Sequence, residues 1–176
     1  MKNATTHWSV ERLDTSIHER AEFDCGQADL NRYLKRYAGQ DSRRGLSRVF
    51  VLCRQDEALV HGYYTLSAVA IGKDEESVQG TNHLPYDLIP AILIGRLGIS
   101  QHQQKKGLGG VLLFDALQRC WCASKVVGVH AVIVDAKDEQ ASMFYQHFGF
   151  KPLTSVPNRL WLVMSSIERL IQEAQD

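Results

Sequence analysis

The segment best suited to bind a ligand is a short glycine-rich run, Gln104-Lys105-Lys106-Gly107-Leu108-Gly109-Gly110. Three of its last four positions are glycine, which is a poor start for a helix because each glycine costs about 1 kcal/mol relative to alanine in a helix interior. Glycine also lets a ligand approach the main chain closely. At a helix start, such a run offers free N–H groups and the positive end of the helix dipole to an anion. The run therefore predicts an anion site, and a diphosphate is its natural occupant.

Two common nucleotide-binding patterns are missing from this run. It matches neither G-x-x-x-x-G-K-[ST] nor G-x-G-x-x-G, so nucleotide hydrolysis and NAD chemistry are disfavoured. A glycine-rich turn without a ligand is the alternative interpretation of so short a motif. An anion site requires a strand before the run and a helix after it, so the surrounding elements decide between the two.

The surrounding sequence predicts that strand and that helix. Residues 92–99 form an apolar segment interrupted by glycines, which predicts a buried central strand, and residues 107–124 predict an amphipathic helix. Further strands are predicted over 7–13, 49–53, 59–71, 129–134 and 160–164, helices over 27–39 and 138–147, a long loop over 72–90, and a surface helix over 165–176. In the helix over 27–39, the apolar face consists of Leu30, Tyr33, Leu34 and Tyr37. This order predicts one α/β (α+β) domain over residues 1–176, with a mixed, mostly antiparallel central sheet flanked by helices.

A basic stretch lies in the first third of the chain. Six basic residues face the single acid Asp41 in residues 30–48, namely Arg32, Lys35, Arg36, Arg43, Arg44 and Arg48. The stretch therefore carries 6 − 1 = +5 in a chain of formal net charge 0, and the remainder carries −5. Such asymmetry is expected of a protein that meets a polyanion. A solvated helix face gives the same pattern, so this stretch alone leaves both interpretations open.

The bulk composition is that of an ordinary globular protein, with 44% hydrophobic and 23% charged residues. No apolar run approaches the length that crosses a bilayer, and the N-terminus lacks the apolar stretch of a secretory signal. We therefore expect a soluble, cytoplasmic protein that does not bind a membrane. The four cysteines (Cys25, Cys53, Cys120 and Cys122) include no C-x-x-C pair, and the sequence has no H-E-x-x-H motif. We expect free thiols and no metal.

The glycine-rich run and its flanking elements resemble a known family. A strand, then Q-x-x-G-x-G, then a leucine-rich helix is similar to the acetyl-CoA pattern of the GNAT acetyltransferase superfamily, which the chain resembles from about residue 8 to residue 164. The resemblance implies the GNAT fold and acetyl-CoA as cosubstrate, with its diphosphate at residues 104–110 and with Lys105 and Lys106 near the phosphates. It also implies that the amides of Leu97, Gly98 and Ile99 polarise the acetyl carbonyl, which requires free N–H groups.

A second segment, Phe144-Tyr145-Gln146-His147-Phe148-Gly149-Phe150, resembles the F-Y-x-x-x-G-F stretch of GNAT enzymes. The tyrosine of that stretch often serves as general acid, and Tyr145 occupies its position. The reaction needs a proton donor for the departing CoA thiolate, and a phenol with a pKa near 10 is protonated at neutral pH. A packed aromatic is the alternative role for Tyr145 and the expected role of Phe144, Phe148 and Phe150. No carboxylate stands out as a base, but an α-amine with a pKa of about 8 is already partly neutral.

The N-terminal part of the chain gives a closer resemblance. Phe23-Asp24-Cys25-Gly26, followed by Leu30-Asn31-Arg32-Tyr33-Leu34, looks like the signature of TacT-type and AtaT-type toxins, and Ile89-Pro90 and Arg96-Leu97 match as well. This resemblance implies acetylation of the α-amine of aminoacyl-tRNA, which blocks translation. It also implies a ribbon-helix-helix antitoxin, through which alone the toxin meets operator DNA. The basic residues from Arg32 to Arg48 would then bind tRNA phosphates. Arg96 has no assigned role, and a homodimer is left open.

Two other functions stay open from the sequence. A GNAT N-acetyltransferase acting on a small amine or a protein N-terminus needs the glycine-rich run but not the basic stretch. A GNAT-like binding module, such as a corepressor with a DNA-binding partner, would bind acetyl-CoA without turnover. It ranks last because the glycines and Tyr145 are intact. Fold alone does not separate these functions.

Overall fold

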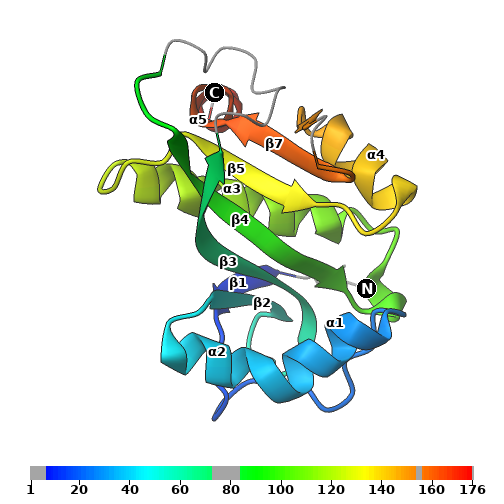
Figure 1. Ribbon diagram of the computed structural model, residues 1–176. Helices are drawn as coiled ribbons and strands as arrows, with labels where there is room; N and C mark the ends of the chain where they lie inside the picture. Colours follow the sequence, from blue (N-terminus) through cyan, green and yellow to red (C-terminus); the bar gives the residue numbers. More distant parts are fainter. Residues whose placement is uncertain (1–6, 73–83, 154–155, 176) are drawn as a thin grey trace. The chain divides into compact units, whose positions relative to one another are not determined.

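The computed structural model describes residues 7–72, 84–153 and 156–175 (Figure 1). Seven strands form one sheet in the order β1-β2-β3-β4-β5-β7-β6. They are β1 (Trp8–Arg12), β2 (Arg48–Arg54), β3 (Val60–Gly72), β4 (Leu88–Ile99), β5 (Ala131–Asp135), β6 (Lys151–Pro152) and β7 (Arg159–Val163). The pairs β1–β2, β2–β3, β5–β7 and β6–β7 are antiparallel, whereas β4 and β5 are parallel. The predicted mixed, mostly antiparallel sheet is confirmed.

The chain forms two compact units. The first consists of Met1–Leu66 and Arg96–Ala116, and the second of Ser67–Gly95 and Leu117–Asp176. Strands β3 and β4 and helix α3 (Leu108–Ser124) contribute residues to both units. The single domain expected from the sequence stays a prediction.

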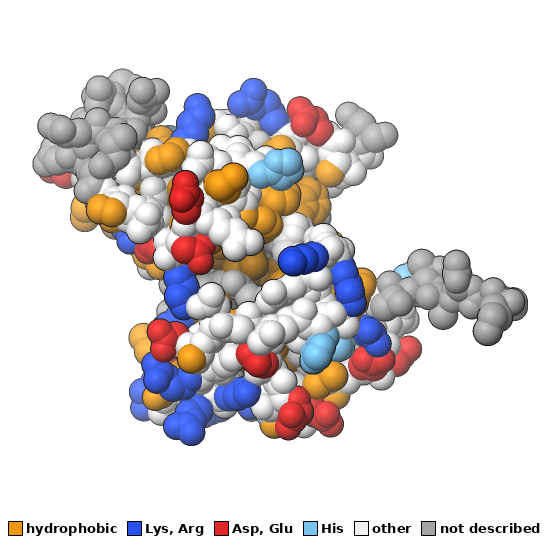
Figure 2. All heavy atoms as spheres, turned by 90° about the vertical axis from the view of Figure 1, so that its right-hand side faces the viewer, with side chains coloured by type: hydrophobic (Ala, Val, Ile, Leu, Met, Phe, Trp, Pro, Cys, Tyr) orange, Lys and Arg blue, Asp and Glu red, His pale blue; other side chains and the backbone are white. Residues whose placement is uncertain are grey.

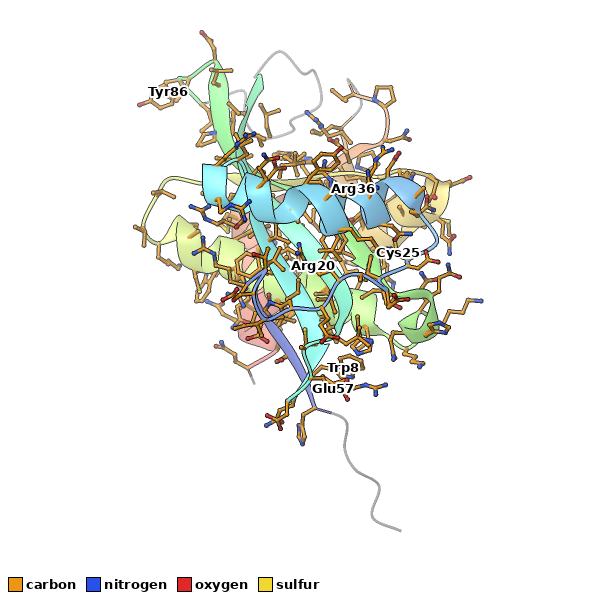
Figure 3. All side chains as sticks on the ribbon, turned by 90° about the horizontal axis from the view of Figure 1, so that it is seen from below. Trp8, Arg20, Cys25, Arg36, Glu57 and Tyr86 are labelled. Atoms are coloured by element: carbon orange, nitrogen blue, oxygen red, sulfur yellow. The ribbon has the colours of Figure 1, made fainter. Side chains whose placement is uncertain are left out.

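In the first unit, helices lie on both faces of the strands. Tyr63 is fully buried and donates a hydrogen bond from its hydroxyl to the carbonyl of Leu30 at 2.9 Å. Tyr64, its neighbour in β3, points to the opposite face because side chains alternate along a strand, and its hydroxyl donates to Asp115 of α3 at 2.5 Å. The core on the Tyr63 side consists of Leu13, Phe23, Cys25, Tyr33, Leu34, Ala38, Val49, Val51, Cys53, Val60 and Tyr63. Figures 1 and 3 show the helical segment of this unit lying across that face.

This helical segment differs from the predicted helix over 27–39. It consists of α1 (Ala28–Arg32), a π-helical turn η1 (Tyr33–Tyr37) and α2 (Ala38–Arg44), and it ends at Gly45, whose φ is 74°. In the π-helical turn the N–H of Ala38 donates to the carbonyl of Tyr33, five residues earlier. This extra residue per turn moves the buried face by one position. Ala38 is therefore fully buried, and the prediction that Tyr37 completes the apolar face is wrong, since Tyr37 is 46% exposed.

In the second unit, β5 is the central buried strand. Its residues 131–134 are buried on both faces and pair in parallel with residues 91–94 of β4. Helix α4 (Glu139–His147) is capped by Asp138, whose carboxylate accepts from the N–H of Ala141 at 2.8 Å. The predicted tail helix is α5 (Met164–Glu173), and it buries Ile167 and Ile171. Of the predicted loop over 72–90, residues 73–83 lie outside the described residues, and its end from Leu88 is already strand β4. Within the described ranges, no helix is both long and apolar enough to cross a membrane.

Candidate functional site

The loop between β4 and α3 is anchored to residues 24–25 and to the end of β4 by hydrogen bonds from two glutamines. After β4, the chain makes a short 3-10 helix (Gln101–Gln103). Gln104 then donates from Nε2 to the carbonyls of Ile99 at 2.9 Å and Cys25 at 3.0 Å. Gln101 donates from its N–H to the carbonyl of Asp24 at 2.8 Å. The Gln104 amide thus holds the loop against the protein's own main chain, which explains why a glutamine precedes the glycines.

A run of five consecutive main-chain N–H groups follows this anchor. Gly110 and Val111 both donate to the carbonyl of Gly107, at 3.1 and 3.3 Å. In contrast, no residue in the described part of the chain accepts a hydrogen bond from the N–H groups of residues 105–109. Lys105 and Gly107 have positive φ values of 61° and 79°. Alternation of left-handed and ordinary backbone turns successive N–H groups toward one side and creates a concave anion site. The helix dipole of α3 adds to the attraction.

The two lysines of the loop have different environments. Lys106 donates from Nζ to the carbonyl of His102 at 2.8 Å and to Oε1 of Gln103 at 3.1 Å, so its ammonium is partly held by the loop. Lys105 is exposed. Leu108 is 6% exposed and anchors the first turn of α3 in the core. The side chains of Gln104 and Leu108 therefore fix the loop against the protein, whereas its N–H groups and Lys105 are open to a ligand. The cofactor-binding role of residues 104–110 stays a prediction.

The end of β4 contains the amides that were predicted to polarise the acetyl carbonyl. The register with β5 covers only Ala91–Ile94, so Leu97, Gly98 and Ile99 lie beyond the last pair. Gly98 is buried against the helical segment, because a Cβ at this position would lie 3.5 Å from Sγ of Cys25 and 3.6 Å from Cδ1 of Leu30. The polarising role of these three amides stays a prediction.

In the second unit, Tyr145 is a buried ring with an available hydroxyl. The residue is 7% exposed, and its ring packs edge-on against Phe144 and Phe150, with centroids 5.2 and 5.6 Å apart. None of the described residues forms a hydrogen bond with its hydroxyl. Burial raises the pKa of the phenol to about 12, because the charged form is poorly solvated in the protein. The phenol is thus neutral at physiological pH, as a proton donor must be. The ring contacts of Phe144, Phe148 and Phe150 confirm that they are packed aromatics.

The basic residues of the stretch 30–48 lie on the helical segment and on β2. Figure 2 shows Lys and Arg side chains gathered on the part of the surface that this segment forms, and Figure 3 labels Arg36 among them. Arg32 is paired with Asp29 at 2.7 Å, and Arg48 donates to the carbonyl of Ser42 at 3.0 Å. Lys35, Arg36, Arg43 and Arg44 are exposed. Within the described ranges, no ion pair involves Arg36, Arg43 or Arg44.

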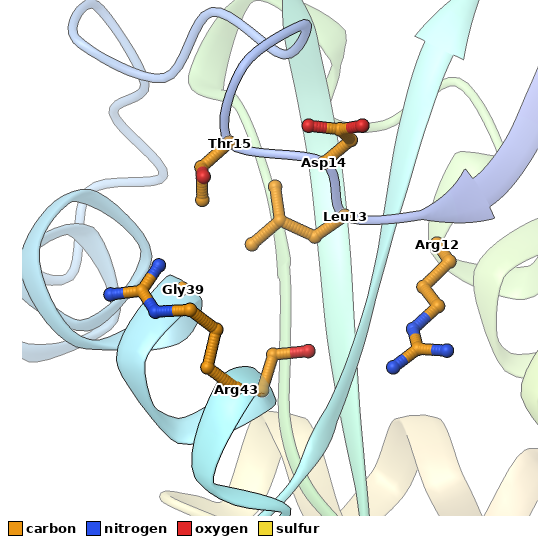
Figure 4. Close-up of a pocket in the computed structure, with 7 residues that line it drawn as sticks. Arg12, Leu13, Asp14, Thr15, Gly39 and Arg43 are labelled. Carbon is orange, nitrogen blue, oxygen red and sulfur yellow. The ribbon is translucent and has the colours of Figure 1, made fainter.

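Arg12 adds to this basic surface, although it was not among the predicted residues. A pocket of about 430 Å³ lies between the end of β1 and α2 (Figure 4). It is lined by Arg12, Leu13, Asp14, Thr15, Gly39, Ser42 and Arg43. Gly39 allows this approach, since a Cβ there would lie only 2.6 Å from Cγ2 of Thr15. Among the described residues, neither Arg12 nor Arg43 has an acidic partner. No signal in the sequence links Arg12 to the stretch 30–48, because Arg12 lies on β1, which is distant from that stretch along the chain.

One group of side chains has the composition of a metal site. Single ligand atoms of Glu11, His18 and Cys53 lie within 4.8 Å of one another. Burial, reinforced by the nearby carboxylates of Glu11 and Glu57, raises the pKa of the Cys53 thiol to about 11. The thiol is therefore protonated at neutral pH, whereas a metal requires the thiolate. All four cysteines are thiols, as expected, and the expectation of no metal stays a prediction.

Comparison with known proteins adds to this geometry. The model of the Acetyltransferase (GNAT) domain family matches residues 87–167. The tRNA-acetylating toxin of Mycobacterium tuberculosis is 32% identical over 164 residues, which are 93% of this chain and 97% of the relative. A probable toxin TacT of Sinorhizobium fredii is 30% identical over 170 residues, which are 92% and 94% of the two chains.

Solved structures of AtaT share the fold. AtaT complexed with acetyl-methionyl-tRNAfMet is 32% identical with a TM-score of 0.86, covering 94% of this chain and 99% of AtaT. A mutant AtaT toxin bound to acetyl-CoA and to the C-terminus of the antitoxin AtaR is 32% identical with a TM-score of 0.82, covering 93% and 98%. The AtaT–AtaR complex bound to DNA is 32% identical with a TM-score of 0.76, covering 93% and 99%.

Proposed function

Because this chain belongs to the GNAT acetyltransferase family, we propose that it transfers the acetyl group of acetyl-CoA to the α-amine of aminoacyl-tRNA and thereby inhibits translation as the toxin of a toxin–antitoxin pair. The observation that carries the proposal is the run of N–H groups at residues 105–109, which have no acceptor among the described residues, in a chain that aligns over 93% of its length with a tRNA-acetylating toxin. The run is a site for a diphosphate, and the alignment includes the basic helical segment, which a small-molecule acetyltransferase does not need.

The glycine-rich loop holds the cosubstrate. Its five N–H groups and Lys105 neutralise the diphosphate of CoA, and Gln104 keeps the loop in the conformation that presents them. When bound, acetyl-CoA supplies the acetyl group as a thioester. The amides of Leu97, Gly98 and Ile99 polarise its carbonyl by donating to the oxygen as negative charge develops.

Tyr145 serves the leaving group. The amine nitrogen bonds to the acetyl carbon, the carbon–sulfur bond breaks, and the amine loses one proton to water. An ordinary thiol has a pKa of about 8.5, well below that of the buried phenol. The Tyr145 hydroxyl therefore keeps its proton and stabilises the developing thiolate by donating a hydrogen bond to the sulfur, and the released thiolate takes its proton from water.

The basic helical segment binds the acceptor. Lys35, Arg36, Arg43 and Arg44 present their charges at the surface, and Arg12 adds a charge at the pocket of Figure 4. Each contact with a phosphate releases condensed counterions, so binding through this surface weakens steeply with salt. Arg32 and Arg48 contribute less than their neighbours, because both already have partners within the protein.

The second candidate is acetylation of a small amine or a protein N-terminus. It rests on the same loop and on Tyr145, and it predicts no role for the exposed arginines of the helical segment. Polyamines are cations, which this basic surface repels. The non-catalytic binding module is less favoured because the Tyr145 hydroxyl is available.

The proposed partners follow from the toxin role. A ribbon-helix-helix antitoxin binds this chain, and operator DNA is contacted only through that antitoxin, in line with the solved complexes of AtaT. We further propose that the toxin is a homodimer and acts in the cytoplasm. Light scattering of the purified chain, with and without its antitoxin, measures both stoichiometries.

Labelled acetyl-CoA tests the proposal against its alternative. The purified chain is incubated with charged tRNA, deacylated tRNA and polyamines in parallel, and the label on each acceptor is counted. The proposal expects label on charged tRNA alone. Label on polyamines alone would establish the second candidate, and acetyl-CoA binding without any transfer would establish the binding module.

A further inference from the structure

Arg96 of β4 is a cation that is held by stacking and has no anionic partner among the residues that the structure describes. Its guanidinium carbon lies 3.6 Å from the centroid of the Tyr33 ring, so the two groups stack face to face. Tyr33 is 4% exposed, and its hydroxyl is hydrogen-bonded to Oγ of Ser47 at 3.0 Å, which fixes the ring. In the described ranges, no residue accepts a hydrogen bond from Arg96 or forms an ion pair with it.

This environment is unusual for an arginine that is only partly exposed. A guanidinium remains charged under all physiological conditions and has five N–H donors in a planar fork. The guanidinium nitrogens of Arg96 are not among the buried side-chain atoms that lack a partner, so they reach solvent and are accessible to a ligand. Stacking on Tyr33 orients the plane of Arg96 but satisfies none of its N–H groups. The site is therefore prepared for an anion from outside the protein.

The position of Arg96 in the strand indicates which anion this is. Side chains alternate along β4, so Arg96 and Gly98 face the helical segment, as the contacts of Gly98 with Cys25 and Leu30 show. Arg96 precedes Gly98 by two residues, or about 6.6 Å along the strand. Along the chain, Arg96 comes directly before the amides of residues 97–99 that are proposed to hold the acetyl carbonyl, whereas the proposed diphosphate site at residues 105–109 comes after the end of β4. An acceptor that meets the acetyl group at these amides therefore passes close to Arg96.

We infer that Arg96 binds the phosphate of the acceptor's terminal nucleotide, one ribose away from the aminoacyl ester. This inference rests on the proposed function and names the part of the substrate that the strand recognises. The planar fork of arginine matches two phosphate oxygens at once. Because the phosphate is one ribose away from the aminoacyl ester, a phosphate bound to Arg96 holds the aminoacyl group at the end of β4. The same positive charge repels polyamines, which gives the enzyme a local preference for nucleotide-linked amines.

Minimal substrates isolate this contact from the rest of the tRNA. We compare two acceptors, a 3′-aminoacyl adenosine with a 5′-phosphate and the same ester without it, and measure kcat/KM for each. The wild type should prefer the phosphorylated ester about 10- to 100-fold, the range for hydrogen bonds to a charged group. Arg96→Gln should reduce this preference to about onefold. Arg96→Lys, which keeps the charge without the planar fork, should retain an intermediate preference.

A matched control separates this subsite from the general basic surface. Arg43→Gln should lower the rate with whole charged tRNA while leaving the preference for the 5′-phosphate at its wild-type value. The preference is a ratio within one variant, so partial loss of folded protein does not change it. An unaltered phosphate preference in Arg96→Gln and Arg96→Lys would overturn this inference alone. Failure of the wild type to acetylate either ester, with transfer to polyamines, would overturn the proposed function and the inference with it.

Discussion

Replacement of Gly107 by alanine tests whether the left-handed backbone of the loop shapes the cosubstrate site. Gly107 has a φ of 79°, and no atom of the described residues lies within 4 Å of the position that a Cβ would occupy. The substitution therefore creates no clash, and its whole effect comes from the backbone, since a residue with a Cβ in this conformation costs about 1–2 kcal/mol. Gly107 is exposed, so the free loop can relax to negative φ and turn its N–H groups away.

The magnitude follows from this strain. Acetyl-CoA must restore the left-handed conformation when it binds, so the variant loses up to about 1–2 kcal/mol of binding free energy, which is roughly a 5- to 30-fold increase in Kd. Isothermal titration calorimetry with acetyl-CoA measures this Kd, and thermal unfolding measures stability. We expect weaker binding with little change in Tm.

Gly45 provides a matched control for this variant. Its φ of 74° is nearly the same, and a Cβ at Gly45 would also have no atom of the described part of the chain within 4 Å. Gly45 ends helix α2, where Leu46 donates from its N–H to the carbonyl of Asp41 at 3.0 Å. That capping bond holds the conformation in place, so Gly45→Ala should lower Tm without changing the Kd of acetyl-CoA. Equal acetyl-CoA affinity in Gly107→Ala and the wild type would refute the idea that this backbone conformation forms the site.

Three further predictions concern catalysis and the acceptor. Tyr145→Phe should lower kcat about 10²- to 10⁴-fold. The Tm and the acetyl-CoA affinity should not change, because the lost hydroxyl has no partner within the described residues. A fully active variant would exclude Tyr145 as the acid. The rate of the wild type should rise with pH through the α-amine pKa of about 8. It should not fall up to pH 10, because burial raises the pKa of Tyr145 to about 12 and its proton is lost only above that value. A fall in rate near pH 10 would show an exposed phenol. The double variant Arg43→Glu and Arg44→Glu should abolish most tRNA binding and lower the slope of log Kd against log salt by about one per lost phosphate contact. Arg32→Gln should have a smaller effect, because Arg32 is already paired with Asp29. Equal losses of binding in filter-binding assays would contradict this ranking.

The sequence predicted the glycine loop and its flanking elements because their signals are local. Three glycines at a helix start, an apolar strand before them and an amphipathic helix after them lie within about 30 consecutive residues. The same holds for Tyr145 and its aromatic neighbours. The two-residue strand β6 was missed because so short an element has no detectable periodicity.

The parts that could not be predicted depend on contacts between distant residues. The π-helical turn shifts the buried face from Tyr37 to Ala38, and a period of 3.6 residues does not detect it. The cosubstrate-binding role of Gln104 stays a prediction, but the sequence did not indicate that its side chain bonds to the carbonyls of Cys25 and Ile99. Arg12 lines a pocket and Arg96 stacks on Tyr33, and neither feature leaves a pattern in the sequence.

The most direct test of the proposed function identifies the acetylated atom. Charged tRNA is incubated with the purified chain and acetyl-CoA, digested to nucleosides, and analysed by mass spectrometry. We predict adenosine esterified with an N-acetylated amino acid, formed by the wild type and strongly reduced with Tyr145→Phe. Unmodified aminoacyl adenosine, or an acetyl group on a base or ribose hydroxyl, would contradict it.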